Sequence, residues 1–164
     1  MVNSRQKWFW ADMGSLALYL HTGNMPQVIF ITVYDFTTVF NIIMTKKVLI
    51  AEDYADTRSF MKFLIESYGY QALEAADGQE AVETVRQQHP DLVLMDLAMP
   101  VMDGLAATRV IRGFDGMTRL PIIAVTAHGQ SYYRQALEAG CDDLINKPLD
   151  FAALEPVLHQ YLGN

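Results

Sequence analysis

The chain has 164 residues, of which 51% are hydrophobic and 19% are charged. This composition is typical of a globular protein with a substantial core, and it excludes an intrinsically disordered chain. The formal net charge of -7 argues against non-specific binding to nucleic acid. Cys141 is the single cysteine, so an intrachain disulfide is excluded, which fits the reducing cytoplasm where we expect the protein to work.

The first 43 residues lack the order of the rest of the chain. Residues 1–27 show no sustained apolar period. The apolar run 28–43 is shorter than the roughly 20 residues that span a bilayer, and Asp35 lies near its middle. We interpret residues 1–43 as an N-terminal extension of doubtful status, whose simplest explanation is non-native upstream translation before a start at Met44. A membrane-associated or partner-binding extension, and an extra strand or helix packed on the domain, remain open alternatives.

From Met44 onward, short apolar runs that end at turn signals alternate with stretches of helical spacing. Such runs indicate strands buried on both faces. The predicted strands are residues 48–51, 71–75, 92–95, 121–126 and 143–146, and the predicted helices are residues 55–68, 78–88, 105–112, 130–139 and 150–162. This alternation predicts an α/β fold, with a parallel sheet that is covered by helices on both faces.

Local signals refine three of these helices. The expected capping residues are Asp53 or Asp56 for the first helix, Asp77 for the second and Asp150 for the last. In the first helix, the apolar spacing is expected to bring Phe60, Phe63, Leu64 and Ser67-Tyr68 to one side. Pro156 lies inside the last helix and lacks a backbone N–H, so we expect it to kink the helix or to delay its start.

Polar side chains follow four of the five predicted strands, at the edge of a parallel sheet where ligands bind. They are Glu52 and Asp53, then Asp96, then Thr126, and finally Lys147. The carboxylates repel one another unless a cation lies between them, and their oxygens suit Mg²⁺. Lys147 supplies a compact positive charge for phosphate, and Thr126 supplies a hydroxyl donor. This set suits phosphoryl transfer to a carboxylate, with the central Asp96 as the nucleophile.

The order of these motifs resembles the receiver domain of two-component response regulators, particularly the stand-alone, chemotaxis-regulator-like members. The resemblance covers residues 44–164. It is carried by the acidic pair Glu52-Asp53, the sequence DLAMPVMDG around Asp96, the sequence AVTA at 124–127, and Lys147-Pro148. Each motif alone is weak, but all four occur in order and at strand ends, which makes the combination specific.

The resemblance implies a flavodoxin-like fold, in which a doubly wound five-stranded parallel sheet has the order 2-1-3-4-5 and is accompanied by five helices. It implies Mg²⁺ binding by Glu52, Asp53, Asp96 and the backbone carbonyl of Ala98. It also implies phosphorylation of Asp96 by a histidine kinase, with Lys147 and Thr126 assisting. The peptide bond between Lys147 and Pro148 is a candidate for the cis form.

One position departs from the family pattern. Receivers usually have Tyr or Phe three residues before the lysine, and this aromatic side chain swings inward on phosphorylation, whereas the present chain has Leu144. The coupling from Thr126 to the face formed by residues 130–162 is therefore in question, although we expect a two-state switch to survive. His128 and Ala98 occupy positions that tune phosphoryl loss in the family.

Other residues near the motifs have simpler interpretations. We expect Asp103-Gly104 to form a turn and not to bind a ligand. Tyr132 and Tyr133 are expected to be ordinary core and helix-surface residues. A haloacid-dehalogenase-type phosphatase is disfavoured, because such enzymes place D-x-D after the first strand, whereas Glu52 and Asp53 are adjacent.

The sequence therefore predicts a single-domain response regulator and not an enzyme, although it would assist its own phosphorylation and dephosphorylation. Its expected partners are a histidine kinase or histidine phosphotransfer protein and a downstream protein. The downstream protein would bind the face of the helix 130–139, the strand 143–146 and the helix 150–162. We expect no binding to nucleic acid, and none to membranes except through residues 1–43. The alternatives are a receiver fragment of a hybrid histidine kinase and a phosphorylation-independent binding module.

Overall fold

The computed structural model describes residues 7–11, 15–22, 25–31, 45–116, 119–127, 129–149 and 151–163. The chain divides into two compact units, Met1–Thr45 and Lys46–Asn164. His128, which was expected beside the site, and Asp150, which was expected to cap the last helix, lie outside the described residues. Within the described part of the chain, no helix has the length and the hydropathy needed to cross a bilayer.

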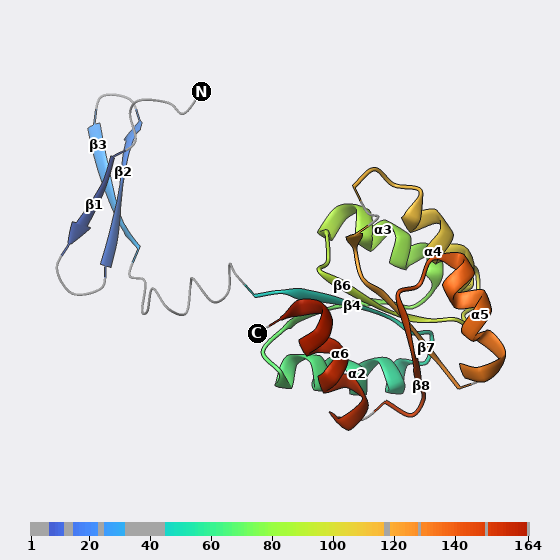
Figure 1. The fold of residues 1–164 in the computed structure, drawn as a ribbon. Coiled ribbons are helices and arrows are strands. Elements are labelled where there is room, and N and C mark those ends of the chain that lie inside the picture. The colour runs from blue at the N-terminus through green and yellow to red at the C-terminus, as the bar shows by residue number, and fades with distance from the viewer. Residues whose placement is uncertain are drawn as a thin grey trace. The chain divides into compact units, whose positions relative to one another are not determined.

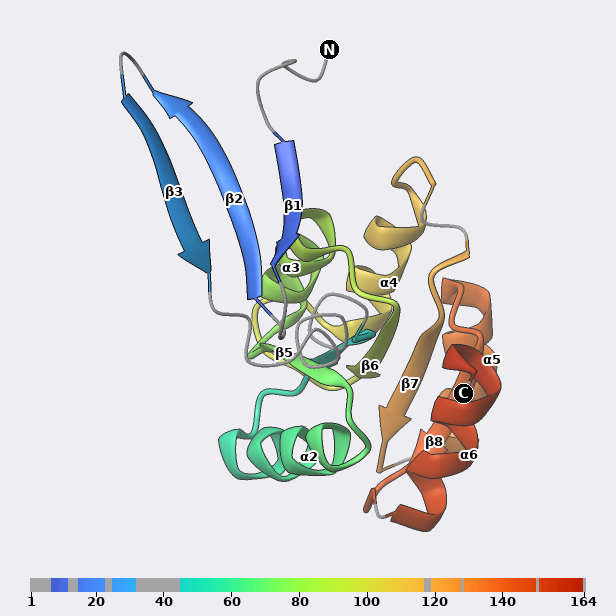
Figure 2. The same cartoon turned by 90° about the vertical axis from the view of Figure 1, so that its left-hand side faces the viewer.

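The first unit contains an antiparallel sheet of three strands in the order β1-β2-β3 (Figures 1 and 2). The strands are β1 (Lys7–Ala11), β2 (Ser15–Thr22) and β3 (Met25–Ile31). Trp8 is paired with Leu18, which in turn is paired with Ile29. These strands were not apparent from the sequence, because apolar residues occupy successive positions along them and hide the alternation that marks a strand.

The second unit is built on a five-stranded sheet in which every neighbouring pair of strands is parallel (Figure 1). Its strands are β4 (Lys47–Ala51), β5 (Gln71–Ala75), β6 (Leu92–Asp96), β7 (Ile122–Thr126) and β8 (Asp143–Asn146). The spatial order is β5-β4-β6-β7-β8, which is the predicted order 2-1-3-4-5. The flavodoxin-like fold class is therefore confirmed, and β6 is the central strand.

Five helices cover both faces of this sheet. They are α2 (Ala55–Ser67), α3 (Gly78–Gln88), α4 (Gly104–Arg112), α5 (Gly129–Ala139) and α6 (Phe151–Leu162). Helices α2 and α6 lie on one face, and α3, α4 and α5 lie on the other (Figure 1). Each face has its own apolar core, and the two cores share β4, β6 and β7, whose residues alternate between them.

The buried side of α2 differs from the prediction. Met61, Leu64 and Ile65 are buried, whereas Phe60 is 48% exposed and Phe63 is 60% exposed. The three buried residues follow the i, i+3, i+4 spacing of one helix face, and a shift by one position turns a side chain about 100° away from that face. The prediction was right for Leu64 and wrong for Phe60 and Phe63, because the buried stripe of the helix runs through Met61 and Ile65.

One further local prediction needs correction, and one of the two alternatives for Pro156 is excluded. The residue at the N-cap of α2 is Tyr54, which makes no side-chain capping hydrogen bond, so neither Asp53 nor Asp56 serves as the cap. Helix α6 begins at Phe151, before Pro156, so the proline does not delay the start of the helix. A proline lacks the N–H for one helix hydrogen bond and its ring crowds the carbonyl one turn before it, and packing of the apolar face of α6 on the sheet outweighs these costs.

Candidate functional site

The polar residues predicted at the strand ends lie at one edge of the parallel sheet. Asp96 is the last residue of β6, and Thr126 is the last residue of β7. Glu52 and Asp53 follow β4, and Lys147 follows β8. Glu52, Asp96 and Thr126 are buried, with exposed fractions of 2%, 5% and 2%, whereas Asp53 is exposed. Three buried polar groups at this edge mark it as a site, because such burial is costly unless the groups serve one another or a ligand.

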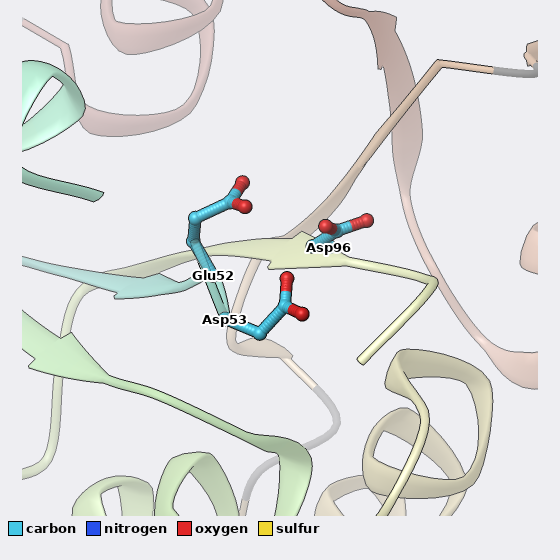
Figure 3. A group of neighbouring side chains, drawn as sticks. All are labelled: Glu52, Asp53 and Asp96. Atoms are coloured by element: carbon cyan, nitrogen blue, oxygen red, sulfur yellow. The ribbon is translucent and has the colours of Figure 1, made fainter. Parts of the chain in front are cut away.

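The three carboxylates form one cluster at the ends of β4 and β6 (Figure 3). One oxygen from each of Glu52, Asp53 and Asp96 lies within 4.8 Å of the others. Backbone amides orient two of them. The Ala98 N–H donates to Asp96 Oδ1 over 3.1 Å, and the Tyr54 N–H donates to Glu52 Oε1 over 3.3 Å. The side chains are thus held toward a common space before any ligand binds.

Lys147 bridges the two buried carboxylates. Its Nζ lies 2.6 Å from Asp96 Oδ2 and 2.6 Å from Glu52 Oε2. The backbone places this side chain, because the Lys147 N–H donates to Thr126 O over 2.9 Å. The Lys147–Pro148 peptide is cis, as expected. Burial alone lowers the pKa of the Lys147 ammonium. The hydrogen bond to Asp96 and the pairing with Glu52 outweigh burial, so the pKa is raised above 10.5. Lys147 is therefore charged at neutral pH.

The donor set fits a divalent cation. One ammonium faces three carboxylates, so the site keeps an excess of negative charge. Glu52 Oε2 is buried, and apart from the Lys147 ion pair it has no hydrogen bond. Ligands that are all carboxylate oxygens suit Mg²⁺ or Ca²⁺ in preference to transition metals, and a small site with few protein ligands suits Mg²⁺.

The loop from β6 to α4 packs tightly behind Asp96. The Gly104 N–H donates to Leu97 O over 3.2 Å, and a Cβ on Gly104 would overlap the backbone oxygen of Asp96. Asp103 is the N-cap of α4 and accepts a hydrogen bond from the Ala106 N–H over 2.7 Å. Asp103-Gly104 therefore form a turn, as predicted, in which Asp103 caps α4 and Gly104 allows the loop to pack closely against the backbone of Asp96.

Leu144 is half-buried on β8, where it packs against the core beneath α3, α4 and α5. A cavity of about 440 Å³ adjoins it and is lined by Gly129, Tyr133, Leu144 and Asn146. Tyr133 is 53% exposed and Tyr132 is partly buried against the core, as predicted for ordinary helix residues. The space beside β8 is consistent with the smaller leucine side chain at this position.

Sequence reasoning missed Arg58. Its guanidinium donates to the backbone carbonyl of Glu52 over 2.6 Å and to that of Asp53 over 3.3 Å. A basic residue early in the helix that follows an acidic pair was the available signal. It was not recognised because hydrogen bonds to backbone carbonyls leave no pattern in side-chain chemistry.

Comparison with known proteins identifies relatives of this unit. A family model described as the response regulator receiver domain matches residues 48–159. The chain is 34% identical over 122 residues to the polar-differentiation response regulator DivK of Brucella ovis, and the match covers 74% of this chain and 99% of that protein.

The chain is also similar to receiver domains of known structure. The chain is similar to the receiver domain of a sensor histidine kinase of Pseudomonas aeruginosa PAO1, with 36% identity, a TM-score of 0.69 and coverage of 73% and 99% of the two chains. That structure has a magnesium ion coordinated in its active site cleft. A second match, with 29% identity, a TM-score of 0.66 and coverage of 71% and 88%, is a complex from Saccharomyces cerevisiae. It joins the histidine phosphotransfer protein Ypd1 and the receiver domain of the downstream response regulator Ssk1.

Proposed function

Because the chain belongs to the response regulator receiver family, we propose that it accepts a phosphoryl group on Asp96 from a histidine kinase or a histidine phosphotransfer protein. The observation that carries this proposal is the cluster of Glu52, Asp53 and Asp96 with Lys147 at the edge of the sheet. Receiver domains are phosphoryl acceptors and not classical enzymes. The finer proposal is that this chain's own groups assist its phosphorylation and dephosphorylation.

In the proposed reaction, a carboxylate oxygen of Asp96 attacks the phosphorus of a phosphohistidine. The new P–O bond forms as the P–N bond breaks, and the histidine nitrogen takes up a proton. The Ala98 N–H holds one Asp96 oxygen, and the Lys147 ammonium holds the other. As negative charge develops on the phosphoryl oxygens, Lys147 pairs with them, and the Thr126 hydroxyl donates to another.

Mg²⁺ is the proposed cofactor, held by Glu52, Asp53, Asp96 and the backbone carbonyl of Ala98. When bound, it neutralises charge on the carboxylates and on the incoming phosphoryl group. The magnesium in the Pseudomonas receiver supports this assignment. The buried Glu52 Oε2, whose one partner among the described residues is the Lys147 ammonium, also supports it.

The phosphoryl donor must bring its histidine to the edge of the sheet, so we propose that it contacts α2. Phe60 and Phe63 are exposed on this helix, and large exposed apolar side chains that lie together are typical of protein-binding surfaces. Phe60 also lines an apolar cavity of about 430 Å³ together with Lys147 and Pro148. The yeast receiver in complex with a phosphotransfer protein supports a donor of this class.

The proposed output surface is the face formed by α5, β8 and α6, which adjoins Lys147 and contains Leu144. Tyr133 and Leu137 are exposed on α5, one helical turn apart. We propose that phosphorylation changes the affinity of this face for a downstream protein, or that the phosphoryl group passes on in a phosphorelay. The proposed site of action is the cytoplasm, with residues 44–164 as the receiver domain and residues 1–43 as an extension outside it.

Intact-mass measurement with acetyl phosphate tests this function on the full chain. With Mg²⁺ the wild type should gain one phosphoryl group, since acetate leaves as the Asp96–phosphoryl bond forms. EDTA or the substitution Asp96→Asn should abolish the gain. Asp103→Asn is the matched control, because Asp103 is exposed in the next loop and asparagine preserves its helix cap. Equal phosphorylation of the Asp96→Asn and wild-type proteins would contradict the assignment.

A further inference from the structure

The acidic turn after β4 is anchored by a side chain that does not itself belong to the cluster. One terminal nitrogen of Arg58 donates to the carbonyl oxygen of Glu52 over 2.6 Å and contacts that of Asp53 over 3.3 Å. Glu52 and Asp53 are consecutive, so these two contacts hold the backbone carbonyls of both residues that carry the acidic side chains. Hydrogen bonds from a charged donor are about twice as strong as neutral ones.

Arg58 is itself held in place from the other side. Its Nε lies 3.6 Å from Glu74 Oε2 on β5. Glu74 also pairs with Lys62 on α2, whose Nζ lies 2.8 Å from Glu74 Oε1. The Arg58 side chain is 19% exposed, against 41% for Lys62. Arg58 therefore connects the acidic turn, α2 and β5, whereas Lys62 reaches only the carboxylate on β5.

We propose that Arg58 is a positioning residue, which fixes the backbone of Glu52 and Asp53 so that their carboxylates meet Asp96 at the distance that Mg²⁺ requires. This inference rests on the proposed function, because it concerns the affinity of the same cation site. Arg58 acts through the two carbonyls and not by touching the metal or the phosphoryl group. Residues that orient metal ligands typically alter metal affinity about 10- to 100-fold when they are replaced.

The positive charge of Arg58 and its carbonyl contacts predict opposite changes in Mg²⁺ affinity when Arg58 is replaced, which makes the proposal testable. A guanidinium beside a cation site repels the cation, so removal of its charge alone should tighten Mg²⁺ binding. Loss of the carbonyl contacts should weaken Mg²⁺ binding, because the acidic turn is then free to adopt other conformations. The direction of the change therefore distinguishes positioning from simple electrostatics.

The experiment is an NMR titration of the full chain with MgCl2, which follows the backbone amide signals of Tyr54 and Ala98. We expect Arg58→Gln to weaken Mg²⁺ binding about 10-fold. Arg58→Lys keeps the charge but loses the planar guanidinium, and it should weaken binding about threefold. Lys62→Gln is the matched control, because it removes a positive charge and a Glu74 partner from the same helix. It should leave the affinity within about twofold of wild type, since exposed ion pairs contribute little.

The outcomes separate this inference from the proposed function. If the wild type shows no saturable Mg²⁺-dependent shift, the proposed function and the role of Arg58 both fail. If the wild type binds Mg²⁺ but Arg58→Gln binds it equally or more tightly, only the positioning role fails. If Arg58→Gln does not fold, Arg58→Lys decides the question, and unchanged affinity in that variant overturns the proposal. An equal loss in Lys62→Gln would also overturn it.

Discussion

Replacement of Lys147 by methionine should destabilise the metal-free protein, although lysine is commonly a dispensable surface residue. Its ammonium pairs with Asp96 and Glu52, whose exposed fractions are 5% and 2%. Removal of one partner from a buried ion pair costs about 3–5 kcal/mol, because a charge is left buried without compensation. The Lys147 side chain is 23% exposed, so water compensates part of the loss. We therefore expect the lower end of that range, about 3 kcal/mol.

Urea unfolding of the full chain in EDTA at pH 7 measures this loss. With a slope of about 2 kcal/mol per molar urea, a loss of about 3 kcal/mol lowers the midpoint by about 1.5 M. MgCl2 should recover more stability in Lys147→Met than in the wild type, because the cation replaces the missing positive charge. Lys147→Arg is the control that keeps a charge, and it should retain most of the stability in EDTA.

The pH dependence of the stability difference between the wild type and Lys147→Met tests the same ion pairs independently. The pKa of Lys147 is raised above 10.5 in the folded protein. The Lys147 ion pairs therefore contribute fully to stability at any pH below the pKa that Lys147 has in the unfolded chain. This contribution is lost only as the pH rises through the folded pKa. The stability difference between the wild type and Lys147→Met should therefore stay constant from about pH 7 to pH 9 and shrink at higher pH. Equal stability of the two proteins in EDTA at pH 7 would show that the Lys147 ion pairs do not stabilise the fold.

Three other substitutions test separate parts of the account. Gly104→Ala should lower the free energy of unfolding by about 1–3 kcal/mol in a urea titration, because its Cβ would overlap the Asp96 backbone oxygen. Phe60→Ser should slow phosphoryl transfer from a phosphorylated histidine phosphotransfer protein but not from acetyl phosphate. The control Val110→Ser, on α4, should slow transfer from neither donor. If Phe60→Ser slowed transfer from both donors, a docking role for Phe60 would be contradicted. Leu144→Tyr should change the free energy of unfolding, measured by urea titration, by less than about 1.5 kcal/mol, because the adjoining cavity has room for the ring.

The fold of residues 46–164 was largely predictable, because buried parallel strands are short apolar runs that end at turn signals. The runs before Asp96 and around Val125 are of this kind, and their parallel order places their carboxyl ends at one edge. The candidate site follows from the same geometry, since Glu52, Asp96 and Lys147 are polar residues at or directly after the ends of three of the strands.

Features that depend on three-dimensional packing were not predictable. The exposed position of Phe60 depends on which face of α2 meets the sheet, and aromatic content does not determine that choice. The strands β1–β3 carry no clear alternation of apolar and polar residues. Arg58 acts through backbone carbonyls, so its contacts appear only when the turn after β4 and the first turns of α2 are seen together.

We propose that Asp96 receives a phosphoryl group and that the site is coupled to the face around Leu144. An NMR measurement on the full chain with Mg²⁺ and beryllofluoride, which stands in for the phosphoryl group on a carboxylate, tests both parts. Backbone NMR is preferred to tryptophan fluorescence, because the two tryptophans, Trp8 and Trp10, lie outside the receiver domain and would not report on its site. We expect saturable, Mg²⁺-dependent shifts on addition of beryllofluoride at Ala98 and along α5 and β8 in the wild type, and none in Asp96→Asn. Shifts confined to the site would indicate a phosphoryl carrier without a coupled switch, and the absence of binding would contradict the receiver mechanism.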